Sequence, residues 1–82
     1  MGKIYVEVFV AAVDKKYEFI VPAVMKAGTA SVLMAQAVAE TEGINFNREN
    51  LMLCTGADNK IIPNNITMDK AGILDGAQLL LI

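Results

Sequence analysis

The chain has 82 residues, of which 55% are hydrophobic and 20% are charged. Nine acidic side chains against seven basic ones give a formal net charge of −2 at pH 7. This length predicts a single domain over residues 1–82, because two cores would each be too small to be stable. The apolar fraction is too high for intrinsic disorder. Because phosphate binding uses clustered Lys and Arg, we expect no nucleic-acid partner.

The residue types that carry enzyme chemistry are scarce. The chain has no histidine, which excludes a His general base, a His metal ligand and a His-activated nucleophile. The single cysteine, Cys54, can form neither an internal disulfide nor a thiolate metal cluster. No basic cluster lies beside it to activate the thiol, so we expect an apolar strand residue. Asp58, Asp69 and Asp75 lie in separate predicted turns, without the spacing of a calcium loop. We therefore expect a non-enzyme with no catalytic residue, cofactor or metal.

No segment of the sequence is typical of a membrane anchor or a leader. The N-terminus alternates between apolar and polar residues and lacks the unbroken apolar stretch of a signal peptide. The apolar run at residues 8–13 is far shorter than the ~20 residues needed to cross a bilayer. We expect a cytoplasmic protein without direct membrane insertion.

Two segments near the N-terminus alternate with the period of a β-strand. The predicted inward side chains of residues 3–10 are Ile4, Val6, Val8 and Val10. In the following segment they are Tyr17, Phe19 and Val21, and Pro22 closes it. The polar run from Asp14 to Lys16 is typical of a turn, so the two segments predict an antiparallel hairpin.

Residues 30–42 are rich in good helix formers. Thr29 is the expected N-cap, and Gly43 is placed to end the helix in the left-handed conformation. A stripe with helical spacing is expected to face the core: Ala30, Leu33, Met34, Ala37 and Val38. The outer flank would then carry Val32, Ala35, Gln36, Ala39 and Glu40, and a rotation of the stripe by one residue stays open.

The C-terminal half predicts short strands separated by turns. Strands are expected over residues 51–54, 60–62 and 78–82, with Pro63 ending the second. Turns are expected at 56–59 and 75–76, and a single helical turn at 67–72. One helix cannot cover a large sheet on both sides. The element order therefore predicts an α+β fold: a mixed sheet of four to five strands with the helix packed across one face.

The last predicted strand is apolar on both of its faces. Leu79 and Leu81 are expected to face the helix, which leaves Leu80 on the far side of the sheet with Met52 and Ile82. Contiguous exposed apolar surface usually marks an interface.

Two alternatives to this surface stay open. The alternation could slip by one residue, or loops could cover the patch. Val10 and Ile20 either extend the patch or belong to the packing of the hairpin itself.

The run from Thr67 to Ile82 resembles the closing segment of the ubiquitin-like β-grasp family: a short turn, a Gly-Ile step at Gly72, a polar turn and a final strand. The resemblance implies that fold. It also implies that Met52, Leu80 and Ile82 match the apolar patch that ubiquitin-like proteins use to recognise partners. Ubiquitin and the sulfur carriers of this fold transfer groups through a Gly-Gly tail, whereas this sequence ends at Ile82. We therefore expect neither conjugation nor sulfur transfer.

Two further stretches are similar to the YukD/EsaB group, the small ubiquitin-like cytosolic proteins associated with type VII (Esx) secretion in Gram-positive bacteria. They are Tyr17-Glu18-Phe19-Ile20-Val21-Pro22-Ala23 and Gly72-Ile73-Leu74-Asp75-Gly76-Ala77-Gln78-Leu79-Leu80. The sequence departs from that group most before the helix, at Met25-Lys26-Ala27-Gly28.

The resemblance implies a non-catalytic protein-interaction module, an accessory or regulatory component of a type VII secretion system with protein partners. Homo-oligomerisation stays open. One alternative is a small effector subunit of a multi-component oxygenase. The other is a sulfur carrier that lacks its Gly-Gly tail.

Overall fold

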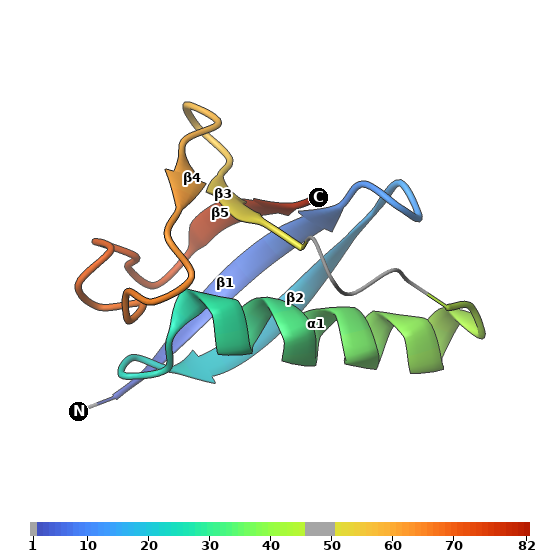
Figure 1. Cartoon of the computed structure of the whole chain (residues 1–82), viewed down its shortest axis with the longest axis horizontal. Coiled ribbons are helices and arrows are strands. Elements are labelled where there is room, and N and C mark those ends of the chain that lie inside the picture. Colours follow the sequence, from blue (N-terminus) through green and yellow to red (C-terminus); the bar gives the residue numbers. More distant parts are fainter. Residues whose placement is uncertain (1, 46–50) are drawn as a thin grey trace.

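The computed structural model describes residues 2–45 and 51–82, which form one helix and five strands (Figure 1). The elements in chain order are β1 (Lys3–Val10), β2 (Lys15–Pro22), α1 (Ala27–Glu42), β3 (Leu53–Thr55), β4 (Ile61–Ile62) and β5 (Ala77–Leu81). The helix runs across one side of the sheet (Figure 1). The predicted element order and fold class are confirmed.

The strands form one mixed sheet in the order β2-β1-β5-β3-β4. β1 and β2 pair antiparallel through their whole length, which confirms the predicted hairpin. β1 and β5, the first and last strands, run parallel side by side at the centre. β3 pairs antiparallel with both β5 and β4. The sheet therefore pairs the first strand of the chain with the last.

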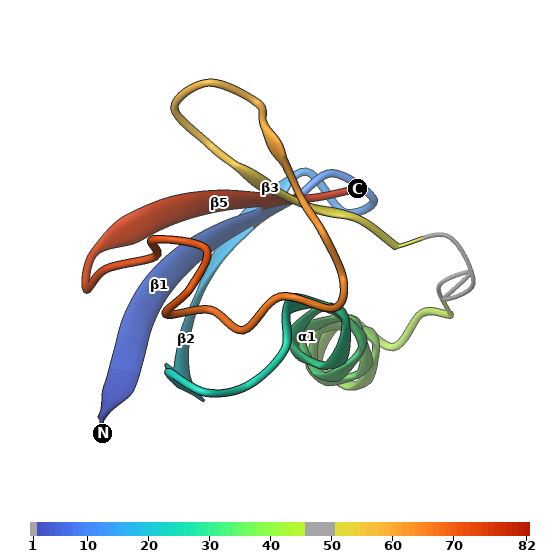
Figure 2. The same ribbon diagram turned by 60° about the vertical axis from the view of Figure 1, so that its left-hand side comes forward.

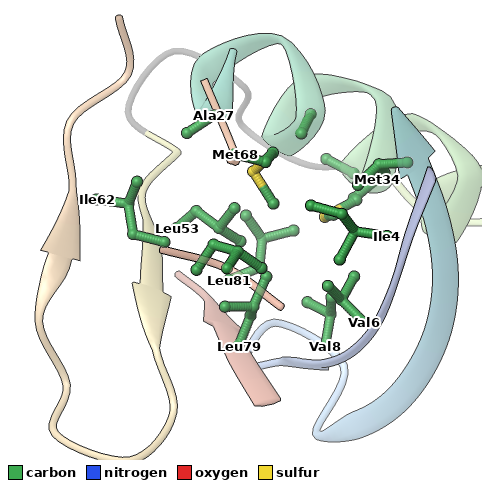
Figure 3. Packing of buried hydrophobic residues seen from close by; sticks show 14 of the residues in the cluster. Ile4, Val6, Val8, Ala27, Met34, Leu53, Ile62, Met68, Leu79 and Leu81 are labelled. Atoms are coloured by element: carbon green, nitrogen blue, oxygen red, sulfur yellow. The ribbon is translucent and has the colours of Figure 1, made fainter. Parts of the chain in front are cut away.

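The core fills the space between the sheet and α1. The predicted inward side chains of β1 are all buried, as are Leu79 and Leu81 of β5 and Leu53 of β3. Figure 3 shows the side chains labelled on β1, β3 and β5 converging with Met34 of α1. Met68 enters from the 67–72 turn and is fully buried. Burial of such side chains stabilises the fold by ~1.5–3 kcal/mol each.

The helix starts three residues earlier than predicted, and Thr29 is not its N-cap. Lys26 occupies that position and makes no side-chain capping hydrogen bond. The first amides are instead bonded by a distant loop, since Ala27 N donates to Ile66 O at 2.8 Å and Gly28 N donates to Asn64 O at 2.9 Å. A tertiary contact thus replaces the local cap. Gly43 ends the helix with a φ of 70°, as predicted.

The predicted rotation of the helix about its axis is partly wrong. Leu33 and Ala37 were expected to face the core but are exposed, whereas Ala35 and Ala39 are buried. Buried Ser31 donates to Gly28 O at 2.8 Å, so its hydroxyl is satisfied inside the core. Alanine is found in the core as readily as on the surface. The many alanines of α1 therefore did not show which face of the helix is buried.

Candidate functional site: the reverse face of the sheet

The reverse face is the side of the sheet turned away from α1. In Figure 2, α1 is seen nearly end-on beneath the sheet, and β1 and β5 have no described helix or strand over their other side. Cross-strand register brings apolar side chains from four strands into line on this face. We call this line the apolar row: Phe9 of β1, Leu80 of β5, Cys54 of β3 and Ile61 of β4.

The structure places all three residues of the predicted patch on the reverse face. Leu80 lies in the middle of the apolar row and is half-buried. Met52 and Ile82 are 38% and 45% exposed. They lie just beyond the ends of β3 and β5, where Met52 N donates to Ile82 O at 2.8 Å and Ile82 N donates to Met52 O at 3.0 Å. None of the three is sealed in the core, and their binding role stays a prediction.

Phe9, Cys54 and Ile61 belong to the same surface but were not predicted as part of it. Ile61 is 56% exposed and Cys54 only 2% exposed, so the thiol is buried although it lies on the open face. The alternation in residues 3–10 already assigned Phe9 to this side. What the sequence does not contain is the register that aligns Phe9 with Leu80.

Neither residue considered as an extension of the patch adjoins the apolar row. Val10 is 1% exposed and faces α1 with the rest of the inward side of β1, so it belongs to the core. Ile20 does lie on the reverse face, but it is paired with Tyr5, four residues along β1 from Phe9.

A polar row runs beside the apolar row. Glu18 of β2, Glu7 of β1 and Gln78 of β5 are consecutive cross-strand partners on the reverse face. A hollow of about 190 Å³ lies where Glu7 and Gln78 meet Phe9 and Leu80 of the apolar row. Known small-molecule pockets are larger, about 300–1,000 Å³. The hollow therefore fits a single side chain better than a substrate.

Each of the three aspartates considered as cation ligands accepts a hydrogen bond from the protein, locally for Asp58 and Asp69 and from β1 for Asp75. Asp58 accepts from the Thr55 hydroxyl, and this hydrogen bond lowers the pKa of the Asp58 carboxyl. Asp69 accepts from Lys70 N at 2.8 Å, and Asp75 accepts from Tyr5 N at 2.9 Å. Within residues 2–45 and 51–82, no group of three or more His, Cys, Asp or Glu could hold a metal ion.

An ion pair joins the hairpin to the far end of the helix. Lys15 Nζ lies 3.1 Å from Glu42 Oε1, and the Tyr17 hydroxyl donates to Glu42 Oε2. The hydrogen bond to Glu42 raises the pKa of Tyr17 to about 12, and the same bond lowers the pKa of Glu42. These residues lie away from the reverse face, and we assign them a structural role.

No helix in the described part of the chain combines the length and apolarity that membrane crossing requires. No family model and no curated protein matches the sequence.

Solved structures match the fold closely at low identity. The ubiquitin-like domain of the Mycobacterium tuberculosis type VII secretion protein EccD1 is similar with a TM-score of 0.76 and 15% identity, covering 100% of this chain and 99% of that one. The EccD5 ubiquitin-like domain from Mycobacterium xenopi gives 0.80 and 17%, covering 100% and 94%. A chain of the toluene 4-monooxygenase HD complex gives 0.84 and 8%, covering 98% and 96%. The fold is therefore ubiquitin-like, similar to the EccD domains of type VII secretion.

Proposed function

We propose that this chain is a non-catalytic protein-interaction module that binds a larger protein through the reverse face of its sheet. The observation that carries the proposal is the apolar row, which spans four strands on the side of the sheet that α1 leaves uncovered. Phe9, Leu80 and Ile61 of this row are accessible to solvent, whereas Cys54 between them is buried. Exposed apolar side chains grouped on one face mark interaction sites in soluble proteins. A typical partner would cover roughly 800 Å² of this chain.

The module would act as a cytoplasmic accessory or regulatory component of a type VII secretion system, in the manner of the YukD/EsaB group. Two observations support this assignment. The sequence resembles that group in residues 17–23 and 72–80. The fold is similar over its whole length to two EccD ubiquitin-like domains.

A second candidate is a small subunit of a multi-component oxygenase. The similarity to a chain of the toluene 4-monooxygenase HD complex favours it, with a TM-score of 0.84. The identity of 8% leaves this similarity at the level of the fold. The two candidates share the reverse face as the binding surface and differ in what binds there.

Affinity capture from the native host separates the candidates. The tagged wild-type chain should retain a secretion-system protein identified by mass spectrometry, and Leu80→Asp should reduce its recovery at least about tenfold. Leu33→Asp is the matched control, because Leu33 is equally apolar but exposed on α1. Recovery of oxygenase subunits would favour the second candidate. Equal recovery by a folded Leu80→Asp variant would contradict the reverse face as the binding surface.

A further inference from the structure

The reverse face carries two rows of different chemistry side by side. The apolar row passes through Phe9 and Leu80, and the polar row passes through Glu7 and Gln78, two residues earlier on the same strands. This spacing along a strand corresponds to about 7 Å. The polar row consists of two carboxylates and an amide, so each of its three side chains offers oxygen acceptors.

The hollow joins the two rows. Phe9 and Leu80 line one side, and Glu7 and Gln78 line the other, while Lys16 of β2 lines it beside Phe9. Gly56 borders it from the loop after β3, where Gly56 N donates to Gln78 O at 2.7 Å. A Cβ atom at Gly56 would lie 2.8 Å from that same oxygen, so no side chain can fill this border. A partner side chain that enters the hollow meets apolar carbon and carboxylate together.

Neither carboxylate of the polar row takes part in an ion pair within the described residues. Glu7 and Glu18 are directly opposite each other across β1 and β2, an arrangement that destabilises a sheet. The ion pair found in residues 2–45 and 51–82 involves neither of them, since it joins Lys15 to Glu42. The cation nearest to these two carboxylates along the sheet is Lys16, which lies beside Phe9 on the reverse face, two residues from Glu18 on β2, and leaves two carboxylates to one ammonium group.

A neighbouring tyrosine reports the same local charge. Tyr5 lies two residues before Glu7 on the reverse side of β1. A hydrogen bond with Glu18 raises the pKa of Tyr5, with a smaller contribution from the charge of Glu7. Bound Arg or Lys would relieve the repulsion between the two carboxylates, whereas an acidic segment would increase it.

We infer that the reverse face selects a partner segment that presents an apolar side chain to the hollow and an arginine or lysine to Glu7 and Glu18. This inference rests on the proposed function, because it assigns the chemistry of the partner to the same surface. Residues two apart in an extended segment have the spacing of the two rows. Residues three or four apart on a helix are spaced about 5–6 Å, which is also compatible.

Selection from a phage-displayed library of random peptides on the immobilised wild-type chain tests the inference. Clones that bind wild type but not Leu80→Asp should be enriched in sequences with Arg or Lys close to a large apolar residue. Their affinity should fall about tenfold or more for the double variant Glu7→Gln/Glu18→Gln, and the dependence on salt concentration should weaken. Glu40→Gln, on the exposed face of α1, should leave the affinity unchanged.

The double variant should also fold, because it removes a repulsion, and a thermal unfolding curve checks this directly. Clones that depend on Leu80 but show no enrichment of basic residues, or show acidic ones, would overturn the inference and leave the proposed function intact. Clones that bind wild type and Leu80→Asp equally, or an absence of binders to the reverse face, would count against the proposed function itself.

Discussion

Leu79 and Leu80 are adjacent on β5 and point to opposite faces of the sheet. Leu79 is 2% exposed in the core beneath the helix, whereas Leu80 is half-buried in the apolar row. One strand thus serves both the core and the candidate site. Substitution of Leu79 should therefore affect mainly the stability of the fold, and substitution of Leu80 mainly the binding of a partner.

The two leucines should differ in their effect on stability. Leu79→Ala leaves a cavity in the core and should lower the free energy of unfolding by about 2–5 kcal/mol. Leu80→Ala removes a partly solvated side chain and should cost less than about 1.5 kcal/mol. Since a chain of this length has a total stability of about 4–12 kcal/mol, urea denaturation resolves the two. Equal losses would show that Leu80 belongs to the core.

The Cys54 thiol should be inert in the native protein. It is 2% exposed, although it lies on the reverse face between Leu80 and Ile61. A thiol reagent should therefore modify it at least about 100-fold more slowly than in denaturant, because reaction needs the local structure to open. A rate of thiol modification in the native protein close to the rate in denaturant would mean that Cys54 is not buried within the apolar row.

A side chain at Gly56 should destabilise the fold. The added Cβ of Gly56→Ala would lie 2.8 Å from the backbone oxygen of Gln78, so β3 and β5 would have to separate. We expect a loss of about 1–3 kcal/mol in the free energy of unfolding. Gly2→Ala is the matched control, because nothing lies within 4 Å of its added Cβ. Identical denaturation midpoints for the two variants would contradict the close approach of these strands.

The link between Tyr17 and Glu42 should make stability depend on pH at both extremes. The pKa of Tyr17 is raised to about 12 from 10.0, so its contribution is complete below pH 10 and is lost as the pH rises through 12. The pKa of Glu42 is lowered from 4.5, so its contribution is complete above that value and is lost at more acidic pH.

NMR titration of the tyrosine side chains checks this link. Glu42→Gln should return the pKa of Tyr17 toward 10.0, because the charged acceptor of its hydrogen bond is gone. The titration of Tyr5 should stay as it is, since Glu18 and Glu7 perturb that residue. Glu40→Gln is the control on the same helix. A Tyr17 titration that is insensitive to Glu42 would contradict the hydrogen bond.

The strands were predictable because strand alternation is short-range. The inward side of β1 and the outward position of Leu80 follow from a period of two residues. The start of the helix and its rotation about its axis were not predictable, because contacts with distant parts of the chain determine them. Ala27 is brought into the first turn by its hydrogen bond to Ile66, far along the sequence. Leu33 is apolar yet exposed, which weakens the amphipathic signal.

Only part of the candidate site could be read from the sequence. The placement of Met52, Leu80 and Ile82 needs only alternation within each segment. The membership of Phe9 and Cys54 needs the register between β1, β5 and β3, which pairing across the sheet decides. The cross-strand pairing of Glu7 with Glu18 depends on register in the same way.

The central claim is that a partner binds the reverse face, and NMR chemical-shift mapping with the captured partner tests it most directly. Addition of that protein to the isotope-labelled chain should shift the resonances of the apolar row and leave those of the exposed side of α1 unchanged. The exposed side of α1 is the alternative binding surface, because it carries the apolar residues Val32 and Leu33. Shifts confined to α1, with Leu80 and Phe9 unaffected, would contradict the account.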